Sequence, residues 1–239
     1  MYCVFCRSDD LPALWAYRGL KLRGLASLEI FTPEALVYNR RLEHRLLAGE
    51  TVTQIELADG RLLNGARVQG VLNRINGLPV EHFRQAAPED QAYARQEQQA
   101  IFLSWIYALP GVVINRPGPR GLGGEVRSPA EWCWLATQAG LPVLPFSQND
   151  KQPMEFSPGD ATFQWVVLDG EVYGASPQWC QADLRTIIKR LAELSGLRLF
   201  GLAFSTSLAG EPRFMSATTL PDLRLGGEGL LDALNAVFA

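Results

Sequence analysis

Hydrophobic and polar residues in the first part of the chain follow the periods of strands and helices in turn. Compact apolar runs at 68–72, 112–114 and 141–146 predict buried strands. Between the first two, 88–109 carries apolar residues at helical spacing and ends at a Pro-Gly pair, which predicts a long helix. A serine cap, a proline and a later glycine predict a second helix at 129–139. This alternation favours a parallel α/β layer.

The second part of the chain has a different pattern. Its Asp-Gly pair at 169–170 stands between runs of alternating character, as does the pair at 59–60 in the first part, and each predicts a β-hairpin because the pair tolerates positive φ. Residues 184–194 place leucine and isoleucine on one helical face, with Gly196 as the expected C-cap. The remaining predicted elements are strands at 197–204 and 212–215 and a final helix at 229–238.

A polar stretch rich in proline and glycine separates these two parts of the chain. Such a composition is typical of a domain boundary. We therefore expect a first domain at 1–146, a linker at 147–160 and a second domain at 161–239.

Composition restricts the function classes. The 239 residues are 47% hydrophobic and 20% charged, which is typical of a globular protein with a sizeable core. The formal net charge of −3 provides no positive field that would attract nucleic acid. No apolar run approaches the roughly 20 residues that a membrane span needs, and the N-terminus lacks a secretion signal. We therefore expect a cytoplasmic protein without nucleic-acid or membrane partners.

Five short motifs stand out. In the first part they are Gly-Val-Leu-Asn-Arg-Ile at 70–75, Val-Ile-Asn-Arg-Pro at 113–117 and Gly-Leu-Pro-Val at 140–143. In the second part they are Val-Val-Leu-Asp-Gly-Glu-Val-Tyr at 166–173 and Leu-Ala-Glu-Leu-Ser-Gly-Leu at 191–197. Together they resemble ATP-grasp proteins, the group that contains ribosomal-protein glutamate ligases and the ligases that cyclise microviridin-type peptides.

The resemblance implies a pre-ATP-grasp-like parallel α/β layer followed by an ATP-grasp carboxyl-terminal lobe with mixed or antiparallel strands and helices. It also implies carboxylate–amine ligation driven by Mg-ATP. The segment between the two parts is too short for the small clasping lobe of that family. The chain therefore resembles a shortened member.

The metal-binding positions of that family are filled differently in this chain. The resemblance places an aspartate at Ala203, a glutamate at Ser216 and an asparagine at Thr218. Magnesium prefers carboxylate oxygens in near-octahedral geometry, and neutral hydroxyls replace them poorly. The chain therefore resembles a degenerate member, and we assign no catalytic residue.

Five polar residues form the candidate ligand site. Asn73 and Arg74 follow one predicted strand, and Asn115 and Arg116 follow the next. Open α/β sheets bind ligands at the carboxyl ends of their strands, and guanidinium groups grip anions through two hydrogen bonds. The family resemblance adds Arg127, which stands where a nucleotide-contacting lysine is common. The alternative is that Arg74 and Arg116 bond loop carbonyls and local acids.

Cys3 and Cys6 have the spacing of a zinc half-site or a redox pair. A structural zinc site needs about four ligands, and His44 and His82 are isolated in the sequence. The alternative is two buried thiols in the first strand. A glycine-rich loop at 117–124 leaves a similar choice, because it can either approach a phosphate or simply connect two elements.

Three hypotheses for function follow. The first is a degenerate ATP-grasp-like protein that needs no cofactor and binds a peptide, a protein partner or an anionic small molecule. The second is a reduced ATP-dependent ligase that uses Mg-ATP, alone or with a partner subunit, and takes replacement carboxylates from Asp160, Glu211 or Asp222. The third is a zinc or redox protein centred on Cys3 and Cys6.

Overall fold

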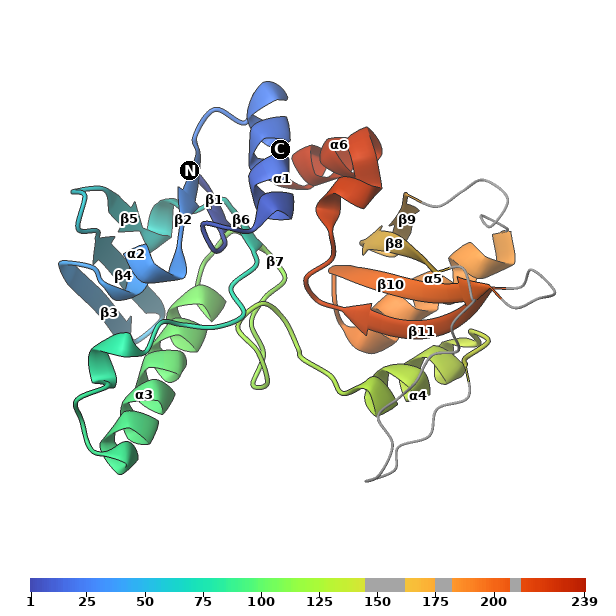
Figure 1. Ribbon diagram of the computed structural model, residues 1–239. Helices are drawn as coiled ribbons and strands as arrows, with labels where there is room; N and C mark the ends of the chain where they lie inside the picture. The colour runs from blue at the N-terminus through green and yellow to red at the C-terminus, as the bar shows by residue number, and fades with distance from the viewer. Residues whose placement is uncertain (145–161, 175–181, 207–211) are drawn as a thin grey trace. The chain divides into compact units, whose positions relative to one another are not determined.

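The computed structural model describes residues 1–144, 162–174, 182–206 and 212–239 (Figure 1). The described residues form two compact units, each with its own hydrophobic core. Unit 1 comprises residues 1–125 and 234–239, and unit 2 comprises residues 126–233. No described helix is both long enough and apolar enough to cross a lipid bilayer.

Unit 1 is built on a four-stranded parallel sheet, as the sequence predicts. Its strands lie in the order β2, β1, β6 and β7, with bounds Leu28–Phe31, Tyr2–Phe5, Gly70–Asn73 and Val112–Ile114. The strands β1 and β6 are almost wholly buried, as expected for a parallel sheet with both faces covered. Because the strands are parallel, their carboxyl ends meet at one edge of the sheet.

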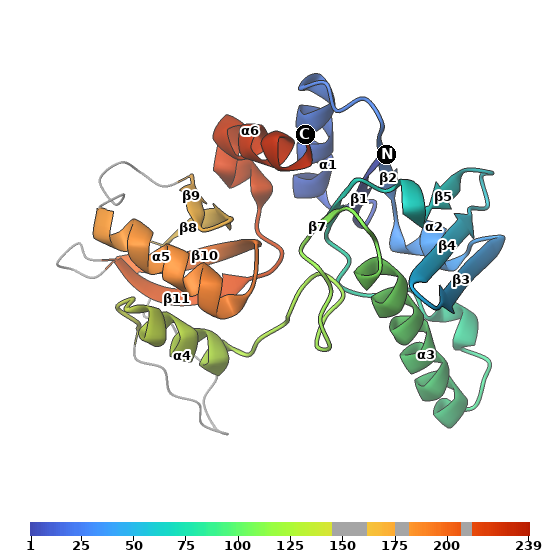
Figure 2. The same cartoon turned by 180° about the vertical axis from the view of Figure 1, so that it is seen from behind.

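Helices α1 (Leu11–Leu22) and α3 (Pro88–Tyr107) lie on opposite sides of this sheet in both views (Figures 1 and 2). α3 buries Trp105 against Phe5 of β1, with the ring centroids 5.6 Å apart. A short helix, α2 (Pro33–Val37), follows β2 and adds to the same core. The long helix predicted at 88–109 is thus confirmed, and it supplies much of the core of unit 1.

A second, antiparallel sheet in unit 1 consists of β3 (Arg41–Leu47), β4 (Glu50–Glu56) and β5 (Leu62–Asn64). β4 and β5 form the hairpin predicted from the Asp-Gly pair at 59–60. β3 is not predicted from the sequence, because its charged and half-exposed residues give no apolar alternation. Two short 3-10 helices, η1 and η2, lie at Gly65–Arg67 and Glu81–Phe83.

Unit 2 contains a four-stranded antiparallel sheet in the order β11, β10, β8 and β9. The bounds of these strands are Pro212–Thr218, Leu199–Thr206, Thr162–Leu168 and Glu171–Tyr173. β8 and β9 form the hairpin predicted at 169–170. Helices α4 (Pro129–Ala139) and α5 (Ala182–Ser195) lie side by side across one face of the sheet (Figure 2). Trp132 and Ile188 join the second core there.

The chain ends in η4 (Leu223–Gly226) and α6 (Gly227–Phe238). α6 begins in unit 2, whereas residues 234–239 belong to unit 1. In unit 1 the ring of Phe238 packs on the ring of Tyr2, with centroids 6.1 Å apart. The predicted final helix is therefore confirmed, and its last turn contributes to the core of the first unit.

Two features differ from the sequence-based expectations. The expected first domain, 1–146, includes α4, but the apolar face of α4 packs in the core of unit 2. The run at 141–146 was expected to continue the parallel layer, yet Val143 forms a parallel bridge to Phe214 of β11. Both differences arise because local periodicity does not specify which sheet an element joins. The predicted linker at 147–160 lies outside the described residues.

The N-terminus of α4 yields a prediction about stability. Ser128 Oγ accepts the Glu131 N–H at 3.3 Å, and the Glu131 carboxylate accepts the Ser128 N–H at 2.7 Å. We expect Ser128→Ala to lower the free energy of unfolding by about 1 kcal/mol, measured by urea denaturation, because one helix N–H loses its acceptor. Ser128→Asp keeps an acceptor and should lose much less. Equal losses in the two variants would contradict the capping role.

Candidate functional site

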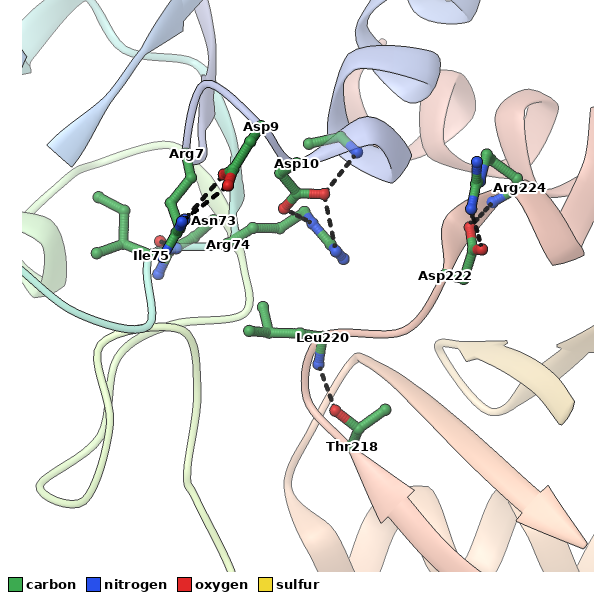
Figure 3. A network of polar contacts seen from close by, with 11 residues as sticks. Arg7, Asp9, Asp10, Asn73, Arg74, Ile75, Thr218, Leu220, Asp222 and Arg224 are labelled. Carbon is green, nitrogen blue, oxygen red and sulfur yellow. Dashed lines mark hydrogen bonds and ion pairs between the residues drawn. The ribbon is translucent and has the colours of Figure 1, made fainter.

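Polar residues from three segments of unit 1 follow strands of the parallel sheet, and Figure 3 shows those of the first two segments, among them Asp10, Asn73 and Arg74. Asp10 follows β1, Asn73 and Arg74 end and follow β6, and Asn115 and Arg116 follow β7. The sequence predicts this shared edge, and the parallel register produces it. Ligand binding at this edge stays a prediction. The hydrogen bonds of each residue show which of its polar atoms already have partners within the protein.

Asn73 is buried and joins two segments of the chain. Its amide nitrogen donates to the Asn115 carbonyl at 2.9 Å and to the Leu122 carbonyl at 2.6 Å. Its amide oxygen accepts the Ile75 backbone N–H at 3.3 Å. Asn73 therefore holds the loop that follows β7 against the end of β6.

Arg74 forms a buried ion pair with Asp10. Its Nε and Nη2 atoms lie 2.8 and 3.2 Å from the two Asp10 carboxylate oxygens, and the two side chains are only 4% and 14% exposed. The same carboxylate accepts the Ala13 N–H at 3.0 Å and caps α1. A second pair, Arg7 with Asp9, is exposed. Arg74 thus bonds an acid of unit 1, which agrees with the structural alternative that the sequence left open, although this acid lies 64 residues away in the sequence.

Arg116 and Arg127 both bind backbone carbonyls. Arg116 donates to three carbonyls around the end of α3, at 2.7 Å from Tyr107, 3.3 Å from Leu109 and 3.1 Å from Gly111. A cation at this helix end also complements the helix dipole. Arg127 donates to the Ser195 carbonyl at 2.7 Å and lies over the Trp132 ring. Arg127 belongs to unit 2, so the predicted residues are divided between the two units.

The glycine-rich loop at 117–124 is closed by its own contacts. Gly118 and Gly121 exchange backbone hydrogen bonds of 2.9 and 3.1 Å. Glu125 accepts the Arg120 Nε–H at 2.6 Å, and a Cβ on Gly118 would collide with the Glu125 carboxylate. Because a carboxylate repels phosphate, this arrangement favours a connecting loop over a phosphate site.

The thiols of Cys3 and Cys6 are both buried, and burial raises the pKa of each to about 12. Cys3 lies in β1 and in the core cluster of unit 1, whereas Cys6 follows the end of that strand. Among the described residues, no three His, Cys, Asp or Glu side chains are grouped to hold a metal ion. These features favour two structural thiols over a zinc or redox centre.

Ala203, Ser216 and Thr218 lie together on one face of the β10–β11 pair. Ala203 pairs directly with Ser216, and Thr218 stands two residues further along β11. Leu202 and Ala217 pack in the core beneath the helices, so alternation turns the other three toward the opposite face. The positions that the family resemblance assigns to metal ligands are therefore neighbours in space.

Asp222, a predicted replacement carboxylate, is engaged by Arg224 (Figure 3). Its carboxylate accepts the Arg224 backbone N–H at 3.1 Å and the Nε and Nη2 donors at 2.8 and 2.6 Å. A metal ion at Asp222 would have to displace this guanidinium. The other two replacement candidates, Asp160 and Glu211, lie outside the described residues.

His44 belongs to a polar network that sequence analysis misses. Its Nδ1 lies 2.9 Å from Thr53 Oγ1, and its Nε2 lies 2.8 Å from Ser104 Oγ. Burial lowers the pKa of His44 below its ordinary value of 6.5. The third member of the network is a hydroxyl, whereas a catalytic triad uses a carboxylate to stabilise the imidazolium. The network therefore ties β3, β4 and α3 together.

No protein-family model matches the chain, and no curated protein matches it. Solved structures do match. The RiPP-associated ATP-grasp ligase of Chryseobacterium gregarium, in complex with ADP and a leader and core peptide, is 11% identical, with a TM-score of 0.69 over 98% of this chain and 96% of that chain. The ATP-grasp ligase PsnB, complexed with a phosphomimetic variant of its minimal precursor, Mg and ADP, is 17% identical, with a TM-score of 0.70 over 100% and 97%.

A third structure is the macrocyclase MdnC of Microcystis aeruginosa MRC, bound with the precursor peptide MdnA. It is 11% identical, with a TM-score of 0.66 over 92% of each chain. The chain has an ATP-grasp fold. At these identities the likeness defines the fold alone. The ATP-grasp fold confirms the class expected from the sequence motifs, a parallel α/β layer followed by an antiparallel lobe.

The buried ion pair at the sheet edge gives a second prediction. We expect Asp10→Ala to lower the free energy of unfolding by about 3–5 kcal/mol, because Arg74 would remain buried without its carboxylate partner. Asp10→Asn keeps the helix cap and should lose about 1 kcal/mol less. Denaturant titration measures both variants. The double variant Asp10→Ala with Arg74→Met removes both charges, and a loss as large as the sum of the two single losses would contradict the coupling.

The His44 network predicts a pH dependence. The folded state resists protonation of His44, whereas the unfolded state binds the proton with the ordinary pKa of 6.5. The free energy of unfolding should therefore be fully retained above that pH and decrease as the pH falls below it. Thermal unfolding of wild type and His44→Gln between about pH 7 and about pH 5 isolates this contribution. Parallel pH profiles for the two proteins would contradict the prediction.

Proposed function

We propose that this protein is an ATP-grasp-fold binding protein that holds a peptide and does not catalyse Mg-ATP-dependent ligation. The observation that carries the proposal is the joint position of Ala203, Ser216 and Thr218 on one face of β10 and β11. These residues stand where the family resemblance expects metal ligands. Their side chains offer a methyl group and two neutral hydroxyls in place of carboxylates.

Magnesium coordination explains why this difference matters. Mg²⁺ binds through one or two carboxylates and the phosphates of its nucleotide, and it gives up its water ligands reluctantly. Without a carboxylate, the ion has little to hold it between the nucleotide and the protein. Phosphoryl transfer requires that the phosphates be held in position and that their developing charge be neutralised. A weakly held magnesium ion does neither well.

A peptide is the favoured ligand because the similar structures hold peptides. MdnC is bound with the precursor peptide MdnA, and the Chryseobacterium gregarium ligase is in complex with a leader and core peptide. In the proposed function, this chain retains peptide binding and does not carry out ATP-dependent ligation. Arg74 bonds the Asp10 carboxylate, and Arg116 bonds the Tyr107 carbonyl. An anionic small molecule at the sheet edge would compete with these contacts and is therefore a weaker candidate.

The alternative function is a reduced ATP-dependent ligase. It is favoured by a similarity that extends over nearly the full length of ligases complexed with Mg and ADP. A ligase built on this chain would need carboxylates from other positions. Asp222 would first have to leave Arg224, to which it makes two side-chain hydrogen bonds.

Calorimetric titration with ATP, with and without magnesium, tests the proposal. We expect no saturable magnesium-dependent binding to the wild-type chain at millimolar ATP, with AMP as the nucleotide control. The variant Ala203→Asp, Ser216→Glu, Thr218→Asn restores oxygen ligands at the three positions and should gain magnesium-dependent binding. Magnesium-dependent binding or ATP hydrolysis by the wild-type chain would overturn the proposal in favour of the ligase.

A further inference from the structure

Helix α1 carries an outward stripe of apolar and basic residues. Leu11, Trp15, Arg18 and Leu22 follow the spacing i, i+4, i+7, i+11, which places them along one line of the helix surface. Leu11 is 61% exposed and Leu22 is 88% exposed. The line is roughly 16 Å long at the rise of an α-helix.

Leu11 and Leu22 are not part of the buried face of α1. The buried face of α1 consists of Ala13, Ala16, Gly19 and Leu20. Ala13, Ala16 and Leu20 lie on the opposite side of the helix from Leu11 and Leu22, whereas Gly19 flanks the stripe. Two exposed leucines in line with a tryptophan are typical of a surface that receives a partner.

The charges around the stripe define the chemistry of that partner. Residues 11–22 contain two basic side chains, Arg18 and Lys21, and no acidic one. Both are exposed, and the Lys21 ammonium lies 4.9 Å from the centroid of the Tyr17 ring. A complementary partner therefore presents acidic residues beside apolar ones at helical spacing.

We propose that α1 is the docking surface for an acidic amphipathic segment of the peptide that this protein binds. The inference rests on the peptide-binding function proposed above and names the surface and the peptide class. α1 begins at Asp10, whose carboxylate caps the helix and pairs with Arg74. A peptide that runs along α1 toward its N-terminus thus reaches the carboxyl edge of the parallel sheet.

The test measures fluorescence anisotropy of a labelled synthetic peptide that places leucines on one helical face and glutamates on the other. Wild-type protein should bind it saturably, and the variant Leu11→Glu, Leu22→Glu should bind at least about tenfold more weakly, because it loses both apolar contacts and gains repulsion. Both leucines are exposed, so this variant should fold. Leu46→Glu, at another exposed leucine of unit 1 that is 68% exposed, is the matched control and should bind like wild type.

The comparison peptide replaces every glutamate with lysine. Preference for the acidic peptide and loss of that preference in Arg18→Glu support the proposal. Equal affinity of wild type and the double-leucine variant for the acidic peptide overturns it. So does a wild-type protein that fails to bind the peptide but binds anionic lipid vesicles. Because no nucleotide is present, this result is independent of the ATP titration. Peptide binding that survives in the double-leucine variant would reject α1 as the surface while leaving the proposed function intact.

Discussion

The ion pair between Arg74 and Asp10 is the contact on which the organisation of unit 1 depends. It joins the end of β6 to the start of α1, and its side chains are only 4% and 14% exposed. Two buried charges cost several kcal/mol to desolvate, so they are tolerated only when their hydrogen bonds are satisfied. Asp10 meets this condition by also capping α1 through the Ala13 N–H. One carboxylate therefore fixes the direction of a helix and the conformation of a sheet edge, and an arginine that looks like a ligand-binding residue becomes part of the scaffold.

Sequence patterns predicted the elements whose signals are local. Both Asp-Gly hairpins and the helix that Ser128 caps follow from residues within a few positions of one another. Partners distant in the sequence were not predicted. Asp10 lies 64 residues from Arg74, and Ser104 lies 60 residues from His44. No periodicity connects such pairs, since only the folded topology brings them together. The sheet that α4 joins was missed for the same reason.

The neutral face of β10 and β11 has consequences for stability as well as for chemistry. Carboxylates grouped to hold a metal repel one another when the metal is absent, and that repulsion raises the free energy of the empty fold. Ala203, Ser216 and Thr218 carry no charge, so this face needs no cation to balance it. Ala203 and Ser216 are small and lie directly opposite one another in the antiparallel register. This neutrality agrees with the proposed function, in which the antiparallel lobe is stable without nucleotide.

Binding and chemistry place different demands on an ATP-grasp fold, and the proposed function assigns them to different units of this chain. The proposed peptide affinity needs an exposed surface of the right shape and charge, and the surface proposed for it is α1 of unit 1, with Leu11, Leu22 and its basic side chains. The family resemblance places the metal ligands for ligation on β10 and β11 of unit 2, at positions that in this chain are the neutral residues Ala203, Ser216 and Thr218. Because each unit has its own core, substitutions on one surface leave the packing that supports the other unchanged. Function resides in sites carried by a fold and not in the fold itself, so a protein can lose catalysis while its recognition surface and its stability persist.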